Sequence, residues 1–137
     1  MKQTKEWKFA SIQHKDFFLK CMDDYCVNDV YHKALFYCLG ISQDTRNHIS
    51  QIYNAKLDCI KPECLFEGWI TSGSARVIRL AFNLFCNGTP SVDEDTMTQE
   101  DQLRESSRYT VEDIFCCSYA PYFWEAIKIR YPEYTLD

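Results

Sequence analysis

The sequence predicts an all-α protein, a single compact domain of about six helices with one long acidic loop. Apolar residues recur at intervals of three and four along most of the chain, and this spacing lines up one face of a helix. Ser, Thr or Asp precedes several of these stretches, where its side chain can cap the first turn. No segment shows convincing strand alternation, although residues 55–60 are ambiguous.

Length and composition are those of one globular domain that spans residues 1–137. The chain has 46% hydrophobic and 26% charged residues, far from the composition of disordered proteins. We expect residues 1–10 to be flexible. No apolar run has the length of a signal-peptide core or a membrane span. We therefore expect a cytoplasmic protein with no membrane partner. Its eight cysteines are expected to be mostly reduced, because Cys21, Cys38 and Cys86 fall on the apolar faces of predicted helices, where a free thiol packs as a small hydrophobe.

The first three helices are expected to begin at the capping residues Ser11, Asp29 and Ser42. The second helix is apolar on nearly every side, which is typical of a buried central helix. Gly40 follows it, and we interpret this glycine as a left-handed stop. The third helix is expected to continue to about Asn54.

The clearest helix begins at Ser72 or Ser74 and ends near Asn87, with a continuous apolar face. We expect residues 74–86 of this helix and residues 29–39 to form the centre of the fold. Further short helices are indicated by Pro62, by the capping pair Thr110 and Asp113, and by Pro121.

Residues 87–108 are expected to form the acidic loop. Up to residue 105 its six acidic residues are opposed only by Arg104, which gives −5, the net charge of the whole chain. The rest of the molecule is therefore neutral. A loop of this length is a mobile, solvated insertion or an acidic arm that occupies a basic groove on a partner. The candidate partner-binding residues are Asp93, Glu94, Asp95, Glu100, Asp101 and Glu105.

Residues 40–50, GISQDTRNHIS, resemble the turn and second helix of a helix-turn-helix DNA-binding motif. Arg46, however, lies where an apolar residue normally locks the two helices together. A neutral body with an acidic loop also lacks the basic surface that binds phosphates. A DNA-binding regulator therefore stays an alternative, and direct nucleic-acid binding is not favoured.

Motifs of common enzyme classes are missing, so we expect no enzymatic activity and assign no catalytic residues. Residues 71–76, with Arg76 and the following Arg79, could bind an anion at a helix start. Ordinary helix capping explains the same residues. If Arg79 points inward, we expect it to pair with a buried carboxylate or carbonyl.

Cys59 and Cys64 have a spacing found in zinc knuckles, and His48 or Cys116 could complete such a site. Only half of a zinc site is visible in this pattern. Thiols that pack in the core are the other interpretation. Zinc is therefore the one cofactor for which the sequence offers candidate ligands, and a small structural zinc-binding interaction module is an alternative function.

Three segments resemble a family of small proteins carried by phages, prophages and conjugative elements of Gram-positive bacteria. They are DVYHKALFYCLGI (29–41), EGWITSGSARVIRLAFNLF (67–85) and YTVEDIFCCSYAPYFWEAIKIRYPEY (109–134). The resemblance implies a genetic context and no catalytic residues. Small acidic proteins of such elements act on host defence or transcription, and anti-CRISPR proteins among them occupy basic channels with carboxylates.

These observations lead to the hypothesis of a non-enzymatic inhibitor that binds a host protein. The expected partner is a nucleic-acid-binding protein such as a CRISPR nuclease, and the acidic loop would block its binding to nucleic acid. An aromatic face near the carboxyl end could also contact a partner, although most of it is expected to be core. Its residues are Tyr119, Tyr122, Phe123 and Trp124.

Overall fold

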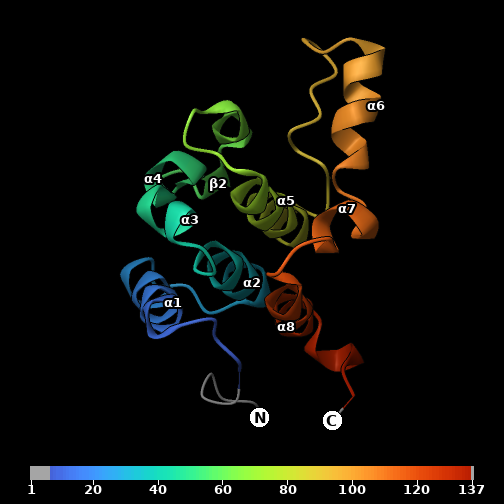
Figure 1. Ribbon diagram of the computed structural model, residues 1–137. Helices are drawn as coiled ribbons and strands as arrows, with labels where there is room; N and C mark the ends of the chain where they lie inside the picture. The colour runs from blue at the N-terminus through green and yellow to red at the C-terminus, as the bar shows by residue number, and fades with distance from the viewer. Residues whose placement is uncertain (1–6, 137) are drawn as a thin grey trace.

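A computed structural model describes residues 7–136, and Figure 1 shows its helices arranged around a central pair. The elements run in the order α1 (Ile12–Asp24), α2 (Val30–Leu39), α3 (Gln43–Asn47), α4 (Ile49–Ile52), β1 (Tyr53–Asn54), β2 (Cys59–Ile60), the 3-10 turn η2 (Pro62–Phe66), α5 (Ser72–Cys86), α6 (Gln99–Ser107), α7 (Val111–Phe115), α8 (Ala120–Arg130) and the 3-10 turn η3 (Pro132–Tyr134). The all-α class is confirmed, with one small hairpin added. No helix within residues 7–136 is long and apolar enough to cross a membrane.

Helix starts follow the local capping chemistry of the sequence. Ser11, Asp29, Ser42 and Thr110 each accept a hydrogen bond from the backbone N–H three residues later. Thr71 does the same for α5, and Ser74 returns a bond to complete a capping box. A cap of this kind contributes about 1 kcal/mol by satisfying an otherwise unpaired N–H at the first turn. The predicted starts of α1, α2, α3 and α7 are confirmed.

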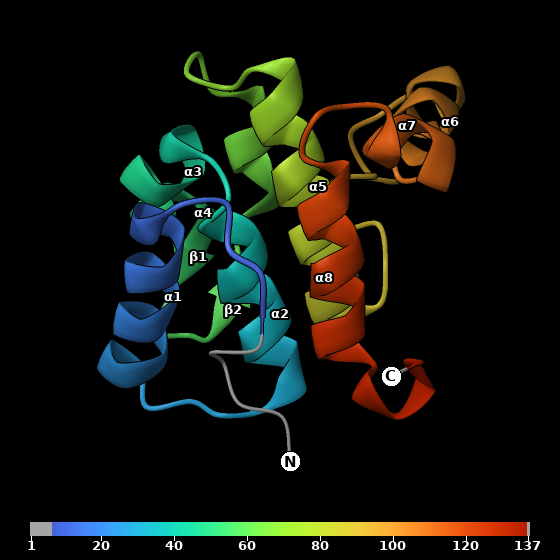
Figure 2. The ribbon, with the colours of Figure 1, turned by 60° about the horizontal axis from the view of Figure 1, so that its bottom comes forward.

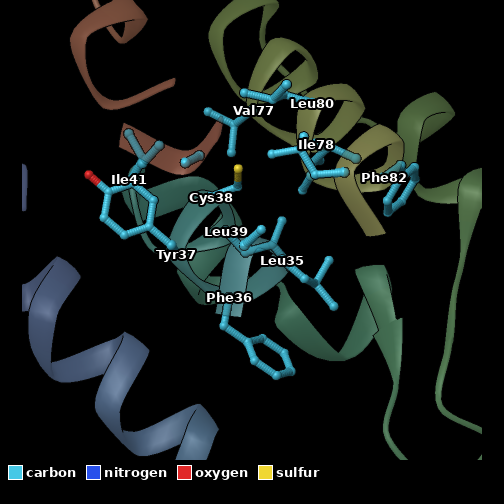
Figure 3. Close-up of a cluster of buried hydrophobic side chains, with 14 of the residues drawn as sticks. Leu35, Phe36, Tyr37, Cys38, Leu39, Ile41, Val77, Ile78, Leu80 and Phe82 are labelled. Atoms are coloured by element: carbon cyan, nitrogen blue, oxygen red, sulfur yellow. The ribbon is translucent and has the colours of Figure 1, made fainter. Parts of the chain in front are cut away.

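The centre of the fold is formed by α2 and α5, as predicted. Figure 3 shows their apolar side chains in contact, with Leu35 and Cys38 facing Val77 and Ile78, and all four are fully buried. Burying a large aliphatic side chain contributes about 2 kcal/mol. In Figure 2, α1 and α8 flank α2 on either side. One apolar cluster therefore joins the helices into a single domain.

Gly40 is required for a reason different from the one predicted. It is not a left-handed stop, because its φ of −81° and ψ of −12° are helical. A Cβ at this position would lie 2.6 Å from the His14 ring and 3.0 Å from the Phe17 ring. Glycine therefore allows α1 to approach the end of α2 closely.

The prediction of a single third helix from Ser42 to about Asn54 is wrong. Helix α3 ends after five residues. At His48 the backbone leaves the helical conformation, and the ring Nδ1 lies 2.7 Å from the carbonyl oxygen of Asp44. After α4, the chain forms a two-stranded antiparallel hairpin in which Tyr53 pairs with Ile60. The ambiguous stretch 55–60 holds the hairpin turn and β2.

Two segments that were expected to be irregular contain defined contacts or a helix. In the first, Trp7 packs against Phe18 with ring centroids 5.4 Å apart, and Phe9 also contacts the core. Residues 1–6 of that expectation lie outside the described residues. The predicted loop 87–108 contains α6, which Thr98 caps by accepting a hydrogen bond from the N–H of Asp101.

Candidate functional site

Residues 87–108, which we call the acidic arm, extend away from the central helices. The arm leaves α5 at Asn87, whose φ of 60° is the left-handed conformation expected just after a helix. Figure 1 shows the chain running outward and returning as α6 beside α7. The arm thus places charged residues at a distance from the core.

The base of the arm is fixed by a buried ion pair. The Nε and Nη2 atoms of Arg79 donate to the two carboxylate oxygens of Glu105 at 2.9 and 3.1 Å. The two side chains are only 10% and 8% exposed. Ser91 donates a further hydrogen bond to Glu105, and its hydroxyl lies 2.6 Å from the Tyr109 hydroxyl. This confirms that Arg79 points inward to a buried carboxylate.

Glu105 therefore does not belong to the surface that a partner could contact. The sequence placed it among the exposed carboxylates, but its residue exposure is 6% and its carboxylate is bound by Arg79 and Ser91. A buried carboxylate needs such partners, because an unpaired charge in a low-dielectric interior is strongly destabilising. Glu105 holds the arm in place instead.

The other five acidic residues of the arm are exposed, but they differ in what already binds them. Glu100 and Asp101 both pair with Arg104, at 2.9 and 2.5 Å. Asp93 accepts hydrogen bonds from the Thr96 hydroxyl and the Asp95 N–H, and these bonds lower its pKa. Within residues 7–136, Glu94 and Asp95 form no ion pair. The unneutralised charge therefore lies at the tip of the arm rather than on α6.

The residues of the predicted half zinc site are not brought together. Cys64 is buried, and burial raises its pKa to about 12, whereas Cys59 is exposed on β2. His48 stacks on Trp69 with ring centroids 4.0 Å apart, and Cys116 is exposed at the end of α7. No three His, Cys, Asp or Glu side chains in the described part of the chain gather as metal ligands. The geometry therefore does not support the zinc prediction.

All eight cysteines lie in described residues, and all are free thiols. Cys21 and Cys38 are in the core, as their helical spacing predicted. Cys86 is exposed, which corrects the prediction that it packs on the apolar face of α5.

The anion-binding candidate at the start of α5 is explained by capping. Thr71 and Ser74 satisfy each other's backbone N–H groups. Arg76 donates from Nε to the carbonyl oxygen of Asp113 at 2.7 Å, and its Nη2 lies 3.8 Å from the same residue's carboxylate. Nη1 of Arg76 also donates to the carbonyl oxygen of Ser72 at 3.4 Å, and Arg79 is held by Glu105. Both guanidinium groups are therefore engaged by the protein itself.

A second polar cluster was not predicted. The His32 ring lies between two carboxylates, with Nδ1 2.6 Å from Asp29 and Nε2 2.8 Å from Asp58. Tyr53 donates to the same oxygen of Asp58 at 2.6 Å. This His32 clamp ties the hairpin turn to the start of α2. Both ring nitrogens are engaged, so the cluster serves as a structural tie and offers no free general base.

The clamp changes the pKa of its members in opposite directions. Burial by itself lowers the pKa of His32, but the hydrogen bonds to Asp58 and Asp29 outweigh it, so the pKa is raised. Hydrogen bonds from Tyr53 and His32 lower the pKa of Asp58. Charged imidazolium and charged carboxylates thus favour one another.

The aromatic face near the carboxyl end is partly core, as expected. Phe123 is fully buried, whereas Trp124 is 56% exposed and packs on Phe115 with ring centroids 4.8 Å apart. Tyr119 and Tyr122 are partly buried against the core.

The fold and the arm define a small α-helical protein with a fixed, exposed acidic extension. The chain belongs to the family of unknown function DUF6075, whose family model matches residues 4–137. No curated protein and no solved structure matches the chain.

Proposed function

We propose that this protein is a non-enzymatic inhibitor that binds a nucleic-acid-binding protein of a host bacterium through its acidic arm. The observation that carries the proposal is an exposed group of carboxylates held away from a nearly neutral body by the buried Arg79–Glu105 pair. Carboxylates in this arrangement compete with phosphates for Arg and Lys side chains.

The fixed base of the arm favours tight binding. A mobile acidic loop loses conformational entropy when it docks, and this loss weakens association. Here the ion pair and the helical structure of α6 order much of the arm beforehand. More of the electrostatic attraction is then available to stabilise the complex.

Among nucleic-acid-binding proteins, we propose a CRISPR nuclease as the partner. Such nucleases hold guide and target strands in positively charged channels that bind phosphates rather than sequence. The resemblance of three segments to proteins of phages and conjugative elements supplies a setting in which blocking this channel is useful. An acidic arm that enters the channel would exclude the nucleic acid.

A pull-down with the full-length protein as bait in lysate of a CRISPR-bearing bacterium tests the proposal. We expect mass spectrometry to find a nucleic-acid-binding protein, and the purified chain to reduce target-DNA binding by the guide-loaded nuclease in a filter-binding assay. Recovery of duplex DNA without a protein partner would overturn the proposal and favour a DNA-binding regulator. Capture of partners that bind no nucleic acid would also contradict it.

A further inference from the structure

A surface groove lies between η2 and the outgoing half of the acidic arm. Its volume is about 700 Å³. One wall is formed by Pro62, Glu63 and Phe66, and the other by residues 90–97. In Figure 1 the turn η2 faces the chain that leads to α6. The groove therefore joins the tip of the arm to the body.

Both walls are anchored from beneath. On one side, Cys64 and Leu65 of η2 are buried in the apolar core. On the other side, Ser91 is 3% exposed and hydrogen-bonds to Glu105 and Tyr109. The groove is therefore formed before any partner arrives, and docking into it requires little ordering of the chain.

The lining combines an exposed aromatic ring with carboxylates. Phe66 is 65% exposed, which is unusual for a residue whose neighbours Cys64 and Leu65 are buried. Among the described residues, the lining includes four acidic residues, Glu63, Asp93, Glu94 and Asp95, and no Lys or Arg. None of the four forms an ion pair within residues 7–136, although the Asp93 carboxylate accepts hydrogen bonds from Thr96 and Asp95. Phosphate groups are repelled here, whereas a guanidinium or ammonium group is attracted both to the carboxylates and to the face of the ring.

We propose that this groove binds a basic peptide segment of the partner in which an Arg or Lys side chain lies next to an apolar one. The cation would contact Glu94, Asp95 and the Phe66 ring, and the apolar side chain would pack on the prolines of the two walls. This inference rests on the proposed function, and it identifies the groove as the main contact with the partner. Glu100 and Asp101 are less available, because Arg104 already neutralises them.

Two short peptides of equal charge serve as probes, acetyl-Gly-Arg-Phe-Arg-Gly-amide and acetyl-Gly-Arg-Gly-Arg-Gly-amide. Each is titrated into the full-length, isotope-labelled protein and followed by amide chemical shifts in NMR spectra. We expect the aromatic peptide to shift the amides of η2 and of residues 90–97 and to bind more tightly than the glycine peptide. Phe66→Ala and the double variant Glu94→Gln, Asp95→Asn should each weaken it about tenfold.

Matched control variants lie on α6. Leu103 is 67% exposed, close to the exposure of Phe66, and Glu100 with Asp101 supplies a carboxylate pair. We expect Leu103→Ala, and the double variant Glu100→Gln, Asp101→Asn, to change the affinity less than about twofold. All four variants alter exposed residues, so unchanged amide dispersion will show that each one folds.

Three results would overturn the groove proposal: shifts confined to α6 or scattered over the surface, equal affinities for the two peptides, or no binding at all. The proposed function fails by a different result. If neutralising the whole arm releases the partner in the lysate pull-down while Phe66→Ala does not, the inhibitor proposal stands and the groove proposal fails. If neither change matters, both fail.

Discussion

Arg79 on α5 and Glu105 on α6 form a bidentate ion pair beneath the acidic arm, 26 residues apart in the sequence. The pair joins the central helix of the fold to the helix that presents the charges. Stability at the base of the arm and binding at its tip are therefore separable properties, and different substitutions should affect each.

Removal of either partner of the pair should destabilise the protein. We expect Arg79→Ala or Glu105→Ala to cost about 3–5 kcal/mol, because each leaves an uncompensated buried charge. Urea denaturation measures the loss, and amide hydrogen exchange in α6 shows whether the arm opens first. Arg104→Ala breaks exposed pairs and should cost less than about 1 kcal/mol. Equal costs for Arg79 and Arg104 would contradict the anchoring role.

Substitution of Gly40 should destabilise the contact between α1 and α2. We expect Gly40→Ala to cost about 1–3 kcal/mol, because the new Cβ would overlap the buried His14 ring, which has little room to move. Gly68→Ala is the matched control, since a Cβ there meets nothing within 4 Å, and it should change stability by less than about 1 kcal/mol. A neutral effect at Gly40 would show that the helices can separate at no cost.

Two histidines should give the protein a stability maximum near pH 6.5. Burial lowers the pKa of His14 from 6.5 to about 4, so its contribution is complete above pH 6.5 and is lost as the pH falls toward 4, a loss of about 3 kcal/mol. The pKa of His32 is raised, so its contribution is complete below 6.5 and is lost as the pH rises through the raised value.

Urea denaturation at about pH 5, 6.5 and 8 measures both slopes. His32→Gln should remove the decrease in stability above pH 6.5 while the decrease below it persists, because His14 is unchanged. A wild-type stability that rises steadily from pH 6.5 to 8 would contradict the charged His32 clamp.

The thiols should differ in reactivity according to burial. We expect a thiol reagent to modify the four exposed cysteines in the native protein and to reach Cys21, Cys38 and Cys64 only after unfolding, because burial raises the pKa of each of these three thiols. The exposed ones are Cys26, Cys59, Cys86 and Cys116. Since Cys59 and Cys64 share no third ligand within residues 7–136, Cys59→Ser should leave the melting temperature unchanged. Protection of Cys59 together with zinc found by elemental analysis would restore the zinc hypothesis.

Features that depend on neighbouring residues could be predicted from the sequence. Ser11, Asp29 and Thr110 cap their helices because the bond joins a side chain to a backbone N–H three residues away. Helix α6 carried the same signal in Thr98 and Asp101, with Glu100 and Arg104 one turn apart. The sequence predicts a loop here because the segment is highly acidic and lacks the apolar stripe that is typical of a packed helix, although Thr98 is a good capping residue.

Features that depend on distant residues could not be predicted. Gly40 resembles a helix stop, and only the approach of His14 shows why glycine is required. Glu105 resembles a surface carboxylate because its partner lies 26 residues earlier in the chain. Asp58 likewise reaches His32 only after the hairpin forms. In each case tertiary packing decides the role of a residue whose local sequence indicates another.

The central claim is that the exposed carboxylates of the arm bind the partner. The most direct measurement is the affinity for the captured partner, at low and high salt, of the wild type and of a variant with Asp93→Asn, Glu94→Gln, Asp95→Asn, Glu100→Gln and Asp101→Asn. We predict a nearly unchanged melting temperature and much weaker binding, with the largest difference at low salt where screening is least. Undiminished binding by this variant would contradict the account and would place the interface on the helical body.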